Sequence, residues 1–287
     1  MAMTINTNVA SLNAQRNTAA NSASLSTTMQ RLSSGLRINS AKDDAAGLAI
    51  ADRMNTQVRG MNVAVRNAGD AISMAQVAEG GLSTMNDLLQ RMRELAVQAS
   101  NAPNSAGSAG DIAKLDNEYK QLGAELSRML DATQFNGEKI LNTSASYVFQ
   151  VGANAGAENQ ITIANGDISL SGNAAFSAVA SGGASATLIT GTASANTANI
   201  AALDAAISAV NDRRASLGAL QSRFENTISY LRTASENQSA ARGRIMDADF
   251  AAETANLSRT QILQQAGTAM IAQANQQPQS VLKLLQG

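Results

Sequence analysis

The chain has 287 residues with a net charge of −1, and its 44% of hydrophobic residues include many Ala and few large groups, since aromatic residues make up 3%. Without clustered Lys and Arg, nucleic-acid binding is disfavoured, and the absence of His and Cys excludes the usual zinc ligands and the Ser-His-Asp and Cys-His catalytic arrangements. No apolar run of about 18 residues occurs, so we expect no membrane insertion, and we also expect no catalytic, cofactor or metal site.

The first segment carries apolar side chains at intervals of three and four on nearly uncharged sequence. Arg16 is the one charged residue among the first thirty, and no basic region followed by an apolar stretch marks a cleavable secretory signal. The spacing predicts an amphipathic helix, and burying each of these side chains would stabilise by about 1.5 to 3 kcal/mol. The apolar stripe consists of Ile5, Val9, Leu12, Leu25, Met29 and Leu32.

A break and a much longer helix follow. Gly35 and Asn39 interrupt the first helix, and Ser40 and Asp43 have the spacing of a capping box. Beyond them a heptad pattern runs from Met54 to Ala75 and resumes from Ala78 to Ala96 after a one-position adjustment. Such a pattern drives helices to wrap on one another. A helix over 44–100 would be roughly 80 Å long, which indicates the spine of a rod.

The middle of the chain changes period. Residues 103–110 predict a turn, and a strict three-four spacing from Ile112 to Met129 predicts a second helix that doubles back. TQFNG, residues 133–137, should end it, with Gly137 in a left-handed turn. Alternation at Tyr147, Phe149 and Val151, at Ile161 and Ile163, and at Ile168 and Leu170 predicts a small antiparallel hairpin or sheet. Residues 171–196 have few large apolar groups and should form a tip, loop or minimal β element.

Helical spacing returns from Ile200 to Leu231, with Arg214 and Gln221 at expected core positions, and continues in a terminal stripe. That stripe includes Leu257, Leu263, Met270, Leu282 and Leu285. We therefore predict a mainly α fold: a long antiparallel helical hairpin or coiled-coil rod with a small β-hairpin region and paired terminal helices. The expected domains are a terminal-helix domain (1–43 with 247–287), a helical rod domain (44–170 with 197–246) and a short surface tip (171–196).

Two groups of acidic residues favour structural roles over chemistry. Asp43 and Asp44 stand at a helix amino terminus, where carboxylates complement the helix dipole. Asp247, Asp249 and Glu253 lack the further ligands and glycine spacing of a calcium loop, so capping or intersubunit contact is the better interpretation. The terminal stripes themselves leave two possibilities open, namely a docked helix pair in a monomer and an interface that other copies of the chain complete.

Four segments of the chain resemble the conserved arms of bacterial flagellins. They read, in order, LSSGLRINSAKDDAAGLAI from Leu32, LLQRMRELAVQASN from Leu88, TQFNG from Thr133, and RIMDADFAAETANLSRTQILQQAGTAMIAQANQQPQSVLKLL near the end. The resemblance implies a filament subunit for motility with a terminal-helix domain, a helical rod domain and a reduced outer domain. It also implies export of the unfolded subunit through the flagellar type III apparatus and polymerisation at the distal tip.

The resemblance further implies partners. These are the chain itself in a helical homopolymer, an export chaperone, the filament cap and hook-junction proteins, and a vertebrate innate immune receptor that recognises Arg91, Leu95 and Glu118. It places the chain outside the cell, in the filament. A hook-filament junction protein shares the terminal helices and is the close alternative, and a secreted membrane-active translocator is a remote one.

Overall fold

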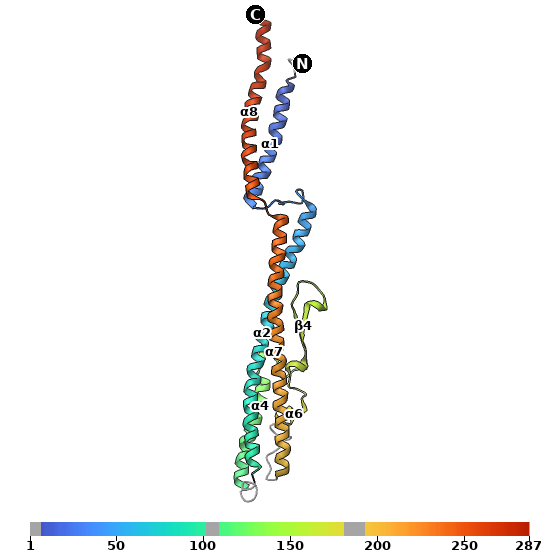
Figure 1. Ribbon diagram of the computed structural model, residues 1–287, viewed down its shortest axis with the longest axis vertical. Helices are drawn as coiled ribbons and strands as arrows, with labels where there is room; N and C mark the ends of the chain where they lie inside the picture. The colour runs from blue at the N-terminus through green and yellow to red at the C-terminus, as the bar shows by residue number, and fades with distance from the viewer. Residues whose placement is uncertain (1–6, 102–108, 181–192, 287) are drawn as a thin grey trace. The chain divides into compact units, whose positions relative to one another are not determined.

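The computed structural model describes residues 7–101, 109–180 and 193–286, coloured along the chain in Figure 1. The chain divides into two compact units, one made of residues 1–56 and 236–287 and the other of residues 57–235. The terminal unit therefore joins the two ends of the sequence, while the second unit holds the middle. The predicted mainly helical fold with small antiparallel hairpins is confirmed.

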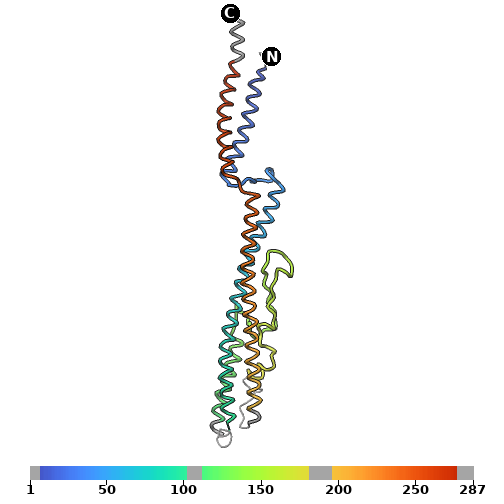
Figure 2. The backbone as a smooth tube through the Cα atoms, viewed as in Figure 1, coloured from blue at the N-terminus to red at the C-terminus, as the bar shows by residue number. Residues whose placement is uncertain are grey.

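The terminal unit is built on two helices, α1 (Val9–Ser34) and α8 (Phe250–Gln286), which lie side by side in Figures 1 and 2. Asn8 caps α1, because its side chain accepts a hydrogen bond from the amide of Ser11 at 3.0 Å. Gly35 ends the helix in the left-handed conformation, with φ of 71°, and donates its amide to the carbonyl of Arg31. The predicted pairing of the terminal helices is confirmed.

The link between the first two helices is held by acidic side chains in capping roles. The carboxylate of Asp43 accepts hydrogen bonds from the amides of Asn39 and Ser40 and from the Ser40 hydroxyl. Asp44 then accepts from the amide of Gly47 at 2.8 Å, where α2 (Ala45–Ala99) begins. Asp249 caps α8 in the same way through the amides of Ala251 and Ala252. The structural interpretation of these carboxylates agrees with these contacts.

The turn at Asp43 is expected to respond to acid. Backbone hydrogen bonds from Ser40 and Asn39 hold the pKa of Asp43 below its usual range. Since the folded pKa is depressed, the stabilisation is present above the unfolded value, about 3.9, and is lost as the pH falls through the lower folded value. The amide chemical shifts of Asn39 and Ser40 should therefore titrate with a midpoint below about 3.9.

Asp43→Asn should abolish that titration, and Asp52→Asn on the exposed side of α2 should leave it in place. A midpoint at the unfolded value or above it would contradict the assignment, because the hydrogen bonds would then not favour the carboxylate.

The second unit contains most of α2 together with α4 (Ala109–Ala132) and most of α7 (Ala193–Met246). The apolar positions of α2 recur at heptad spacing and are fully buried in one core with Tyr119 and Leu126 of α4 and Leu217 of α7. The buried positions of α2 in this row are Ala75, Ala78, Leu82, Met85, Leu89, Met92 and Ala96. The predicted coiled packing of long helices is confirmed.

Two hairpins lie against these helices. Strands β1 (Gln134–Phe135) and β2 (Glu138–Lys139) pair around a turn in which Gly137 has a positive φ, as predicted. Asn136 also has a positive φ, and the pairing of these two strands was not predicted. Strands β3 (Tyr147–Gln150) and β4 (Gln160–Ile163) pair antiparallel, Tyr147 opposite Ile163, with the short helix η1 (Ala157–Asn159) between them. Phe149 of β3 meets Phe224 of α7 edge to face at 5.9 Å.

Two local predictions are wrong. Ile168 and Leu170 are buried but do not lie in a strand, because Ile168 ends the short helix α5 (Asn165–Ile168). A further helix, α6 (Ala174–Ala180), replaces the tip, loop or minimal β element expected there and buries Phe176 and Val179. Ala favours the helical conformation, so local preference and the burial of Phe176 and Val179 against the core both support α6. Residues 181–192 of the same predicted tip lie outside the described residues.

Candidate self-assembly surface

The seam between α1 and α8 consists mainly of small and polar side chains at heptad spacing. Every seam position alternates steps of three and four along its helix and is buried or half-buried. On α1 these are Ser11, Ala14, Thr18, Asn21, Leu25, Thr28 and Leu32; on α8 they are Glu253, Leu257, Thr260, Gln264, Gly267, Ile271 and Ala274. The contact between α1 and α8 therefore buries little apolar surface.

Specific polar contacts set the register of this seam. Asn8 donates to the carbonyl of Ala274 at 2.8 Å, and the Ser11 hydroxyl donates to Asn275 at 2.8 Å. At the other end of the seam, Arg31 pairs with Glu253 at 3.2 Å, and the Glu253 side chain retains 11% of its exposure. A mostly desolvated ion pair is costly to break, so slippage of one helix along the other is disfavoured.

The predicted assembly residues fall into three groups. Leu25, Leu32 and Leu257 are half-buried in the seam. The others described stay exposed: Val9 at 65%, Leu12 at 52%, Met29 at 56%, Leu263 at 43% and Met270 at 63%. Ile5 lies outside the described residues, as do the side chains of Leu282 and Leu285.

The pairing of α1 with α8 thus covers Leu25, Leu32 and Leu257 in part and leaves the other described members of the two stripes exposed. Most of the large apolar side chains lie beside the seam, and Ser, Thr and Asn lie in it. The recurrence of Ser11, Thr18 and Leu25 every seven residues was the sequence signal that could have identified the seam face of α1. Ile262 and Phe250 are further exposed apolar residues that the sequence interpretation missed. The terminal unit therefore presents apolar side chains on both helices to its surroundings, as interaction surfaces do.

At Gly267 the two helices approach each other closely. A Cβ added there would lie 2.6 Å from the hydroxyl of Thr18, which donates to the carbonyl of Ala14. Gly218 of α7 is the matched control, because its added Cβ would meet nothing within 4 Å. Gly218→Ala should stabilise by about 0.5 to 1 kcal/mol through helix propensity.

Gly267→Ala should instead lose this gain and loosen the pair, which is measurable as faster hydrogen exchange of the α1 amides. Equal stabilisation by both substitutions would show that the approach of Thr18 is not a constraint.

A second set of predicted residues lies in the other unit. Arg91 of α2 donates to Glu118 of α4 at 2.8 Å and to Glu94 at 3.0 Å, and these hydrogen bonds, that to Glu118 foremost, raise the pKa of Arg91. Arg91 and Glu118 are exposed. Leu95 is fully buried in the core, so the structure brings Arg91 and Glu118 together on the surface and withdraws Leu95 from it.

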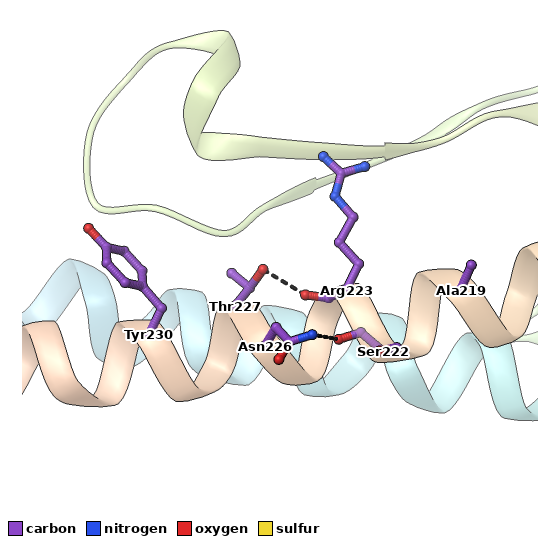
Figure 3. Close-up of a pocket in the computed structure, with 6 residues that line it drawn as sticks. All are labelled: Ala219, Ser222, Arg223, Asn226, Thr227 and Tyr230. Carbon is purple, nitrogen blue, oxygen red and sulfur yellow. Dashed lines mark hydrogen bonds between the residues drawn. The ribbon is translucent and has the colours of Figure 1, made fainter.

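A surface hollow of about 520 Å³ lies along α7. Figure 3 shows that Arg223 extends from α7 toward the ribbon of the β3–β4 region. The residues that line the hollow are Ala219, Ser222, Arg223, Asn226, Thr227 and Tyr230. Asn226 and Thr227 donate to carbonyls one turn back on their own helix.

Two further kinds of site that bear on function are metal-ligand clusters and membrane-spanning helices. Within residues 7–101, 109–180 and 193–286, no cluster of three or more potential His, Cys, Asp or Glu metal ligands occurs. The helices of that same part of the chain include none that is long and apolar enough to cross a membrane.

Comparison with known proteins connects this geometry to one family. Residues 5–146 match the model of the bacterial flagellin N-terminal helical region, and residues 200–285 match that of the bacterial flagellin C-terminal helical region. The two matched regions contain α1 and nearly all of α8, and they leave the interval containing α6 unmatched.

Full-length relatives agree. The chain is 47% identical to a flagellin of Halalkalibacterium halodurans and 40% identical to a flagellin of Bacillus subtilis, in each case over 99% of this chain and 100% of the relative. It is 42% identical to the flagellar filament 33 kDa core protein of Treponema phagedenis, with the same coverage. A crystal structure of Bacillus cereus flagellin shares 26% identity with a TM-score of 0.47, covering 62% of this chain and 94% of that one.

Proposed function

The chain belongs to the bacterial flagellin family and is a structural subunit of the flagellar filament, and from this premise we propose that α1 and α8 carry its main self-assembly surface. The observation that supports the proposal is the exposed apolar set of the terminal unit: Val9, Leu12, Met29, Leu263 and Met270. The seam between the helices leaves these side chains in water, and copies of the chain would cover them.

The low charge of the two ends suits such a surface. In a helical homopolymer each side chain meets copies of the same neighbours, so a charge there would repeatedly lose its water shell or face a like charge. Arg16 of α1 and Arg259 of α8 are the exposed charges in the stretches that carry the apolar set. Asn, Gln, Ser and Thr remain polar there without that cost.

We extend the proposal to the domains and to the path of assembly. Residues 1–43 with 247–287 would form the inner terminal-helix domain and residues 44–170 with 197–246 the rod domain. The short interval 171–196, whose helix α6 packs into the rod core, would stand in place of a larger outer domain. The unfolded subunit would leave the cell by flagellar type III export with a chaperone and would polymerise under a cap beyond the hook-junction proteins. The filament would then lie outside the cell.

Seeded growth tests the proposed surface and the filament role together. Purified subunit added to short filament seeds should elongate into long helical fibres visible by electron microscopy. Short caps of a few added copies would instead favour a hook-filament junction role, which the full-length flagellin relatives do not favour.

A vertebrate innate immune receptor is a further proposed partner, at Arg91 and Glu118. In monomeric protein, Arg91→Ala should lower receptor signalling strongly, because it removes a charged donor from an exposed pair. Arg93→Ala is the matched control, since Arg93 is also exposed and pairs with Asp204 of α7 at 2.6 Å. Receptor reporter cells measure both variants.

Unchanged signalling after combined Arg91→Ala and Glu118→Ala would remove this proposal. Leu95→Ala is a poor test, because Leu95 lies in the core and its truncation would destabilise the unit by roughly 2 to 5 kcal/mol.

A further inference from the structure

The outer face of α2 carries a regular row of charges that the filament role leaves unexplained. Its residues recur every seven positions, lie in the unit of residues 57–235 and are all exposed. They are Arg59, Arg66, Ser73, Gly80, Asp87 and Glu94. We call them the α2 outer row.

The position of this row follows from the buried heptad of the same helix. One buried row contains Ala68, Ala75 and Leu82, and the other contains Ala71, Ala78 and Met85. These two buried rows lie next to each other on one face of α2. The outer row occupies the heptad position on the opposite face. The row therefore runs along the side of α2 that points away from the core.

The order of charges along the row is self-complementary in an antiparallel sense. Two cations are followed by two small residues and then by two carboxylates. A second copy of α2, rotated by a two-fold axis midway between Ser73 and Gly80, places Arg59 opposite Glu94 and Arg66 opposite Asp87. Each contact occurs twice, as a two-fold interface requires. A parallel copy in register would place every charge against its like.

The positions that flank the row fit the same axis. Asp70 would face Ser83, and Arg91 would face Asn62, so the flanks add no pair of like charges. Val77, which is exposed, lies beside the axis. Gly80 has open space where a Cβ would stand, and with Ser73 it lets two helices approach closely at the centre.

Most of the charges are available for a partner. Among the described residues no ion pair is formed by Arg59, Arg66 or Asp87, while Glu94 accepts from Arg91 and keeps 67% of its side-chain exposure. We propose that two unpolymerised copies of this chain associate antiparallel through the α2 outer row. Copies in a helical filament share one direction, so this two-fold contact lies outside the filament and goes beyond the proposed function.

The association should be weak and sensitive to salt, because exposed ion pairs gain little individually and are screened. Sedimentation velocity of unpolymerised protein should show dimers at about 20 mM salt and monomers at about 500 mM salt. Arg66→Glu should raise the dimer dissociation constant about tenfold or more, and Arg66→Glu with Asp87→Arg should restore it. Arg232→Glu, an exposed position on α7, should change nothing.

A cysteine pair tests the register, since the chain has no Cys of its own. Ser73→Cys with Gly80→Cys should form a disulfide-linked dimer under oxidation, because residue 73 of one copy faces residue 80 of the other. In Ser73→Cys alone the two thiols would be about 10 Å apart along the helix, so no link should form. A dimer linked through Ser73→Cys alone would overturn the antiparallel register.

Wild-type protein that is monomeric at low salt, or a charge reversal that Asp87→Arg fails to rescue, would overturn the proposal. Seeded filament growth is recorded on the same samples. Wild-type protein that fails to elongate seeds would count against the filament function and leave the dimer intact. Filament growth by a protein that is monomeric at low salt would reject the dimer alone.

Discussion

Met270→Glu is expected to abolish seeded filament growth while leaving the subunit folded. Met270 is exposed in the subunit, so a carboxylate there meets water and costs the monomer little. In the proposed polymer interface the substitution forfeits about 1.5 to 3 kcal/mol of apolar burial and adds the desolvation of a charge. A free energy of about 1.4 kcal/mol is a factor of ten in an equilibrium constant. The critical concentration for polymerisation should therefore rise about tenfold to a hundredfold.

Pelleting of polymer after seeding measures this change, and far-UV circular dichroism verifies that the helices persist. Leu263→Glu should act in the same way, because Leu263 is also exposed on α8. Met270→Leu is the matched control, since it keeps the apolar surface and a similar volume. Normal filaments from both Glu variants would count against the proposed surface, and failure of Met270→Leu to assemble would show that the site tolerates no change at all.

Phe224→Ala is expected to destabilise the unit of residues 57–235 by about 3 to 5 kcal/mol. Phe224 is fully buried in the core and supports Phe149 of β3 edge to face. Its truncation leaves a cavity and removes the ring contact that holds the β3–β4 hairpin to α7. Urea unfolding of the monomer, followed by circular dichroism, should show a lower midpoint.

Tyr230→Ala, about two helical turns farther along α7, is the control, because Tyr230 is exposed and its loss should change stability by less than about 0.5 kcal/mol. Equal effects of the two substitutions would mean that the aromatic contact does not anchor the hairpin. In Phe224→Ala the hairpin amides should also exchange faster than those of the core helices, since the hairpin loses its anchor directly.

The sequence alone was sufficient for the long helices and for the hairpin. A buried heptad from Ala68 to Ala96 leaves one face of α2 apolar whatever its neighbours are, and alternation at Tyr147 and Phe149 places both on one side of a strand. The break at Gly35 was also local, since it needs only a residue that adopts positive φ. Periodicity and turn chemistry are properties of short segments, so they can be read without the fold.

Tertiary structure decided which face of each helix is covered and by what. Val9 and Leu12 lie on one side of α1 and Leu25 on another, and the spacing alone did not decide which side is covered. Pairing with α8 selected the side of Ser11, Thr18 and Leu25 and left Val9 and Leu12 in water. Likewise, burial of Leu95 depends on the core that α2, α4 and α7 form together, and α6 depends on a place for Phe176. A residue pattern determines a helix face, whereas its burial depends on partners distant in the sequence, which only the folded chain brings into contact.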